Sequence, residues 1–175
     1  MRKLKNSELP RKTVQEFKTT GKYPVYLVLD NVRSLNNVGS AFRTADAFLI
    51  EGMGLCGITA CPPHREIHKT ALGATDSVEW TYYNQTMDAV ADLRRQGYTI
   101  LSVEQTEDSI SLPSFTPSGK EKYALIFGHE MKGVQQAVVD QSDGCIEIPQ
   151  HGTKHSFNIS VSVGIVLYHF YLHLR

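Results

Sequence analysis

The sequence predicts an α/β protein with a mostly parallel sheet flanked by helices. Short apolar runs rich in β-branched and aromatic residues alternate with longer stretches whose apolar residues recur at helical spacing. Strands that alternate with helices need crossover connections, which make the strands parallel. The length of 175 residues fits one domain, and the 41% apolar and 21% charged residues are close to the average for globular proteins.

The first half of the core is predicted from three segments. Residues 23–30, YPVYLVLD, form a β-rich apolar run and predict a buried strand. Residues 37–48 follow with apolar side chains at helical spacing and predict a helix. Residues 55–59 predict a second strand between glycines, whereas residues 61–83 are mixed and define no element.

The second half alternates in the same way. A helix is expected over residues 86–96, which Gly97 ends, and another over residues 131–139, which Glu130 opens. Three short apolar runs predict strands, at residues 99–103, 123–127 and 145–148. The last helix, residues 160–174, is apolar on nearly every face and must therefore be buried on all sides. Such burial requires either a partner subunit, which would make the protein a homodimer, or a path across the chain's own sheet.

The formal net charge is zero, but the charge is unevenly distributed. Residues 1–24 hold seven basic and two acidic side chains, a net charge of +5, so residues 25–175 carry −5. A basic N-terminal extension on a mildly acidic domain is typical of proteins that grip a polyanion, although a solvated extension without a partner has the same composition. Neither a signal segment nor a membrane span is predicted, and the expected location is cytoplasmic.

Disulfide and metal chemistry are not indicated. The three cysteines are an odd number without CxxC spacing, which predicts neither a disulfide framework nor a cysteine-built zinc site. Histidines form three pairs four residues apart, but no pair has the further ligands that zinc needs. His129 and Glu130 do not begin an HExxH motif, because the fifth residue is Gly133.

Ligands of parallel sheets bind past the carboxyl ends of the strands, so the loops after Asp30, Val103, Phe127 and Ile148 are where a site is expected. The first of these loops is crowded with asparagine, serine and arginine. Arg43 stands inside the apolar helix that follows, where its guanidinium needs a carboxylate, a phosphate or solvent. The residue type alone is compatible with a structural ion pair and with a ligand contact.

The other two motifs are polar segments directly after strands. Gly128 would let a ligand approach the backbone, and Glu130 would be stabilised at a helix start, although a turn and a cap explain both. Ser156, Asn158 and Ser160 precede the last helix, and capping accounts for only one of them. The surplus hydrogen-bonding groups suggest a binding role.

In this order and at these strand ends, the three motifs resemble those of the SpoU/TrmH family of the SPOUT class, the RNA ribose methyltransferases. The resemblance covers roughly residues 26–170. It rests on NVGSAFRTADAF with Asn37 and Arg43, on LIFGHEMKGV with Gly128 and Glu130, and on IEIPQHGTKHSFNISVSVGI with Ser156 and Asn158.

The resemblance implies a SPOUT-type fold with a C-terminal trefoil knot, a homodimer, bound S-adenosylmethionine, and methylation of a ribose 2′-hydroxyl in tRNA, or next in rRNA, without a metal. The implied catalytic residues are Arg43, Asn37, Glu130, Ser156 and Asn158. The implied cofactor contacts are Val103, Gly128, Ile148 and Phe157, the last in place of the leucine common in the family. The candidate RNA contacts are Arg2, Arg11, Lys12 and Arg33.

Arg43 is interpreted as a clamp on the phosphate beside the target ribose. A guanidinium stays protonated above about pH 12, so it stabilises a developing alkoxide better than it removes a proton. By the same resemblance, Asn37 and Glu130 would position substrate and loops, and Ser156 and Asn158 would line the methyl-transfer pocket. Two alternatives stay open, a catalytically silent RNA-binding protein of the same fold and a methyltransferase acting on a base nitrogen. A nucleotide-binding oxidoreductase is disfavoured, because no GxGxxG follows a predicted strand.

Overall fold

The computed structural model describes the whole chain, residues 1–175, and confirms the predicted α/β class. Seven strands form one sheet in the order β3-β2-β1-β6-β4-β7-β5, and every neighbouring pair is parallel. The strands are β1 (Tyr23–Asp30), β2 (Ile50–Cys56), β3 (Trp80–Tyr83), β4 (Tyr98–Val103), β5 (Ile110–Ser111), β6 (Lys122–Phe127) and β7 (Gly144–Glu147).

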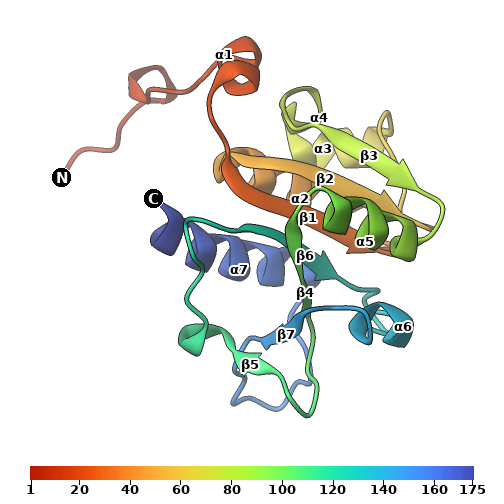
Figure 1. Cartoon of the computed structure of the whole chain (residues 1–175). Helices are drawn as coiled ribbons and strands as arrows, with labels where there is room; N and C mark the ends of the chain where they lie inside the picture. The colour runs from red at the N-terminus through yellow and green to blue at the C-terminus, as the bar shows by residue number, and fades with distance from the viewer.

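Helices cover the sheet, and the N-terminal segment with α1 projects beyond it (Figure 1). The helices are α1 (Val14–Thr19), α2 (Leu35–Ala47), α3 (Arg65–Ala71), α4 (Ala74–Ser77), α5 (Thr86–Arg95), α6 (Gln136–Val139) and α7 (Ile159–Leu174), with short 3-10 turns η1 (Asn6–Glu8) and η2 (Leu112–Ser114). None of these helices is long and apolar enough to cross a membrane.

Two apolar clusters fill the two faces of the sheet. The larger cluster includes side chains from α2, α3 and α7, and the smaller cluster includes side chains from α5 and α6. Strand β1 contributes to both, because Leu27 and Leu29 belong to the larger cluster and Val28 between them belongs to the smaller. A strand buried on both faces has a nearly continuous apolar sequence, which explains why β1 is predicted correctly.

Helix α2 is held unusually close to α3. A Cβ on Gly39 would overlap the Thr70 hydroxyl and the Ile67 carbonyl, so only glycine fits at this crossing. The two helices therefore meet backbone to backbone, which places α2 rigidly between α3 and α7.

Helix α7 packs on α2 and η2 but is not buried on all sides. Val163, Val166 and Phe170 are fully buried, whereas Val161, Tyr168 and Leu172 are exposed. The chain's own sheet thus covers one face of this apolar helix, and the other face is open. The homodimer expected from its sequence stays a prediction, as does the trefoil knot.

The strand expected at residues 55–59 and the helix expected at residues 131–139 have other bounds in the structure. The strand expected at residues 55–59 is β2, which begins at Ile50 and ends at Cys56, because Gly52 and Gly54 dilute its apolar pattern. Gly52 is needed there, since a Cβ would lie 2.8 Å from the ring of Tyr26. The mixed segment 61–83 contains α3, α4 and β3.

The helix expected over residues 131–139 is only the short α6. Residues 128–135 instead form a tight turn in which Gly133 adopts the left-handed conformation, with φ of +68°. Glu130 therefore lies in this turn and does not open a helix, which corrects the prediction.

Candidate functional site

A cavity of about 740 Å³ lies at the carboxyl edge of the sheet, where the parallel topology predicts a ligand site. The loops after β4, β6 and β7 and the start of α7 enclose it. All four expected cofactor contacts line this cavity, namely Val103, Gly128, Ile148 and Phe157. Three of the expected catalytic residues line it as well, namely Glu130, Ser156 and Asn158. We call it the strand-end cavity.

The turn of residues 128–135 forms one wall of the strand-end cavity. Its backbone closes on itself through hydrogen bonds from the His129 N–H to the Gly133 carbonyl, 3.0 Å, and from the Gly133 N–H to the His129 carbonyl, 2.8 Å. A Cβ on Gly128 would overlap the backbone of Gly133 and Val134. Glycine at position 128 is thus required by the turn's own backbone. Its approach by a ligand stays a prediction.

Glu130 ties this turn to the start of α2. Its carboxylate accepts hydrogen bonds from the backbone N–H of Arg33 at 3.1 Å, from that of Ser34 at 2.9 Å and from the Asn37 side-chain amide at 3.1 Å. Burial raises the pKa of Glu130, but the hydrogen bonds to the charged form outweigh it and hold the pKa below its ordinary value. The first and second motifs are therefore joined through one carboxylate.

Two further carboxylates hold the same turn, and the sequence reasoning did not single them out. Glu104 accepts from the Val134 N–H at 2.9 Å. Asp30, which is fully buried at the end of β1, accepts from the Gln135 N–H at 2.8 Å, from the Gln135 side-chain amide at 2.6 Å and from the Thr86 hydroxyl at 2.5 Å. The only sequence feature that could have indicated the role of Asp30 is its place as an acid at the end of a buried strand, with no basic residue next to it.

The third motif forms the opposite wall. Asn158 is the N-cap of α7, and its side-chain oxygen accepts from the Ser160 N–H at 2.9 Å and from the Ser160 hydroxyl at 2.7 Å. The Gln105 side chain donates to the His155 carbonyl at 3.1 Å, which joins the loops after β4 and β7. Ser156 has no hydrogen-bond partner within the chain and is exposed at the cavity, so it is free to meet a ligand.

Arg43 does not lie at the strand-end cavity. It is six residues beyond Asn37 on α2, which places it about 9 Å along the helix axis and about 120° around it. It forms no ion pair or side-chain hydrogen bond, so the structural ion pair that the sequence left open is absent. It lines a second cavity of about 700 Å³ between α2 and the N-terminal segment, which we call the arm groove.

The candidate RNA contacts fall into three places. Arg11 and Lys12 line the arm groove with Arg43. Arg2 is paired with Glu8 through two hydrogen bonds of 2.9 and 3.0 Å. Arg33 is exposed beside the turn that holds Glu130. No group of three histidine, cysteine, aspartate or glutamate side chains is placed to hold a metal ion.

A parallel sheet with a mixed polar and apolar cavity at its carboxyl edge defines an α/β ligand-binding domain. Comparison with known proteins identifies the family to which this domain belongs. Residues 24–168 match the SpoU rRNA Methylase family, and the chain belongs to this family.

Individual relatives are similar over most of this chain. It is 28% identical over 148 residues to the tRNA (guanosine(18)-2'-O)-methyltransferase of Borreliella burgdorferi, covering 85% of this chain and 66% of that protein. It is 30% identical over 146 residues to the 23S rRNA (guanosine-2'-O-)-methyltransferase RlmB of Nitrosomonas europaea, covering 81% of this chain and 54% of that protein. The chain thus spans less than two thirds of either relative.

A solved structure has the same fold. The AdoMet-bound rRNA methyltransferase of Sinorhizobium meliloti superimposes with a TM-score of 0.80 at 26% identity, covering 90% of this chain and 59% of that one. The strand order and the placement of the helices described above are therefore those of a SpoU-type domain.

Proposed function

We propose that this protein transfers a methyl group from S-adenosylmethionine to the 2′-hydroxyl of a ribose in structured RNA. One observation carries the proposal: motif residues far apart in the sequence, Gly128, Glu130 and Ser156 among them, converge on the strand-end cavity. The similar proteins named above act on guanosines of tRNA and of 23S rRNA. We prefer tRNA as the substrate, with rRNA next, and expect the protein to act in the cytoplasm.

The strand-end cavity fits this cofactor in size and in chemistry. Its volume of about 740 Å³ is within the usual range for small-ligand sites. Apolar side chains such as Phe127 and Ile148 suit an adenine ring, and the carboxylates of Glu104, Glu130 and Glu147 suit a ligand with ammonium and sulfonium charges. When bound, S-adenosylmethionine supplies a methyl group already activated by its sulfonium charge, so the chemistry needs no metal.

The chain's own residues would hold and enclose the cofactor. The backbone at Val103, Gly128, Ile148 and Phe157 would surround it. Glu130 and Asn37 would keep the turn and the start of α2 in fixed relation, because their side chains are bonded to each other. Ser156 and Asn158 would line the side from which the ribose enters.

Arg43 would act on the RNA. Its guanidinium fork can bind two oxygens of the phosphate beside the target, orient the ribose and stabilise negative charge developing on the 2′-oxygen. The hydroxyl proton would leave to solvent, because a guanidinium has no acceptor site for it.

We propose further that Arg43 serves the strand-end cavity of a partner subunit in a homodimer. It lines the arm groove and not the cavity of its own chain. The open apolar face of α7 adjoins the end of α2 through the contact of Tyr168 with Phe48, whose ring centroids are 6.2 Å apart. A second copy covering this face would bury its apolar side chains and stand beside Arg43.

The test is methyl transfer from labelled S-adenosylmethionine to unmodified tRNA and rRNA, followed by digestion and identification of the labelled nucleoside. A 2′-O-methylnucleoside is the expected product. A base-methylated nucleoside would support the base-nitrogen alternative. RNA binding without any binding of S-adenosylmethionine would support the silent RNA-binding protein.

A further inference from the structure

We propose that the arm groove binds the RNA sugar–phosphate backbone next to the target ribose, and that the N-terminal segment folds to build this site. The inference rests on the proposed function, because it gives Arg43 neighbours on the same RNA strand. It assigns a ligand to a cavity separate from the strand-end cavity.

The arm groove collects basic side chains that have no partner. Arg11, Lys12 and Arg43 all line it, and none of them forms an ion pair or a side-chain hydrogen bond. Two acids also line the groove, Asp46 and Asp76, and neither forms an ion pair with these three cations. The groove thus has a formal charge of +1, and its three unpaired cations can each bind a phosphate.

The N-terminal segment is docked on the domain and is not a loose basic tail. Thr13 caps α1, accepting from the Glu16 N–H at 3.2 Å while Glu16 accepts from the Thr13 N–H at 2.7 Å. Phe17 is only 4% exposed and belongs to the larger core cluster, and Lys18 lies 3.4 Å from Glu79. Arg11 and Lys12 directly precede this anchored helix, so their backbone is held at the groove.

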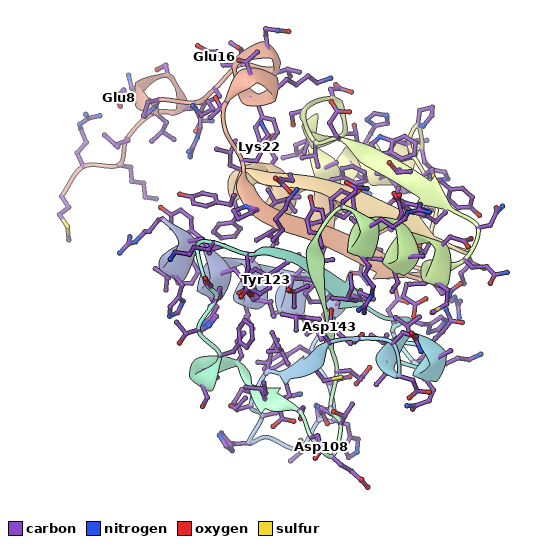
Figure 2. All side chains as sticks on the ribbon, in the orientation of Figure 1. Glu8, Glu16, Lys22, Asp108, Tyr123 and Asp143 are labelled. Carbon is purple, nitrogen blue, oxygen red and sulfur yellow. The ribbon has the colours of Figure 1, made fainter.

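Figure 2 shows the two ends of this segment. Glu8 lies on the outer part, away from the sheet, where it pairs with Arg2. Glu16 and Lys22 lie where the chain turns back to the domain. Of the basic residues in the segment, Arg11 and Lys12 line the groove, Lys18 and Lys22 pack on Glu79 and Phe17, and Arg2, Lys3 and Lys5 belong to the outer part, which does not line it.

The walls of the groove suit a nucleotide chain better than a free anion. Tyr23, Phe48 and Tyr171 line it beside the cations, are half-buried, and pack against one another at centroid distances of 5.6 and 5.7 Å. Aromatic faces beside basic groups are the usual combination for single-stranded RNA, whose bases stack while its phosphates pair. If Arg43 holds the phosphate beside the target ribose, Arg11 and Lys12 hold the phosphates that follow.

The test compares two double variants that remove the same charge from the same segment. Arg11→Gln with Lys12→Gln alters the groove, and Lys3→Gln with Lys5→Gln alters the outer part. Equilibrium binding of unmodified tRNA is measured across a salt series, and S-adenosylmethionine binding is measured separately. For the groove variant we expect RNA affinity to fall roughly tenfold near 0.1 M salt, and the slope of log K against log salt to fall by about 1.5. The outer variant should change little, and cofactor binding should be unchanged in both.

Equal losses in the two double variants would overturn the proposal, because the segment would then act through its total charge. No loss in the groove variant would overturn it as well. A third variant, Phe17→Ala, keeps every charge but removes the anchor of α1, and it should weaken RNA binding without affecting cofactor binding. If the variants show these differences in RNA binding but the wild-type protein transfers no methyl group, the proposed function fails while the groove assignment stands.

Discussion

At the scale of a single residue, Arg43 is the side chain whose role is most sharply defined by its position. It is exposed, unpaired and outside the strand-end cavity. Arg43→Ala should therefore lower kcat for RNA methylation by about 10²–10³-fold, the usual effect of losing one charge-stabilising donor, with cofactor affinity unchanged. Arg43→Lys should recover only part of the rate, because an ammonium lacks the guanidinium fork.

Rate measurements with RNA and calorimetric titration with S-adenosylmethionine check this prediction together. Near-full activity of Arg43→Lys would contradict the clamp. Lost cofactor binding in Arg43→Ala would place the residue in the cofactor site instead.

Glu130 predicts a pH dependence of stability. Its pKa is lowered in the folded protein, so its contribution is fully present above the unfolded carboxyl pKa of about 4.3 and is lost as the pH falls through the lower folded value. Glu130→Gln should be less stable than wild type at neutral pH, with a difference that shrinks on acidification.

Urea midpoints measured at several pH values for both proteins test this. Glu107→Gln, an exposed acid with no hydrogen-bond partner in the chain, is the control and should match wild type throughout. A difference for Glu130→Gln that stays constant from neutral to acidic pH would contradict the proposed charge interaction.

At the scale of elements, burial decided which parts could be predicted. Strands β1, β4 and β6 are largely buried and have mostly apolar sequences, so their positions follow from the sequence. Strand β2 has two glycines in seven residues, which break that pattern. The helix expected after Glu130 fails because Gly133 reverses the backbone there.

The loops that form the site could be predicted, because parallel strands direct their carboxyl ends to one edge. The side chains that hold these loops in place could not be predicted. Asp30 bonds to Gln135, 105 positions away, and Glu104 bonds to Val134, 30 positions away, through backbone N–H groups that any residue type provides. The motif predicts Arg43 as a catalytic residue beside the target ribose, but it does not predict that Arg43 lies outside the strand-end cavity of its own chain.

The turn of residues 128–135 should loosen when Asp30 loses its charge. Asp30→Asn places amide hydrogens against the donors of Gln135 and Thr86, and a buried unsatisfied group costs about 1–3 kcal/mol. We expect the free energy of unfolding to fall by about that amount and the affinity for S-adenosylmethionine to weaken.

Urea unfolding and calorimetric titration measure both effects. Asp140→Asn, at an exposed acid directly after α6, should stay within about 0.5 kcal/mol of wild type. Unchanged cofactor affinity in Asp30→Asn would mean that the turn does not depend on this carboxylate.

At the scale of the whole molecule, the open face of α7 predicts the oligomeric state. Tyr168 and Leu172 are 52% and 39% exposed on one face of this mostly apolar helix. Wild-type protein should sediment as a dimer, and Tyr168→Glu should shift it toward monomer, because a carboxylate cannot be buried there unpaired. Tyr82→Glu, at a similarly exposed tyrosine on β3, should leave the dimer intact. A monomeric wild type, or loss of the dimer in both variants, would contradict this assignment.

The measurement that tests the central claim most directly is methyl transfer to unmodified RNA by a mixture of two inactive variants. Arg43→Ala leaves the strand-end cavity intact, and Gly128→Ala forces its wall to shift while leaving Arg43 intact. We predict that each variant alone is inactive and that their co-refolded mixture forms a 2′-O-methylnucleoside at about a quarter of the wild-type rate, since half of the randomly formed dimers are mixed and each has one complete site. A mixture that stays inactive although mixed dimers form, or a product methylated on the base, would contradict the account.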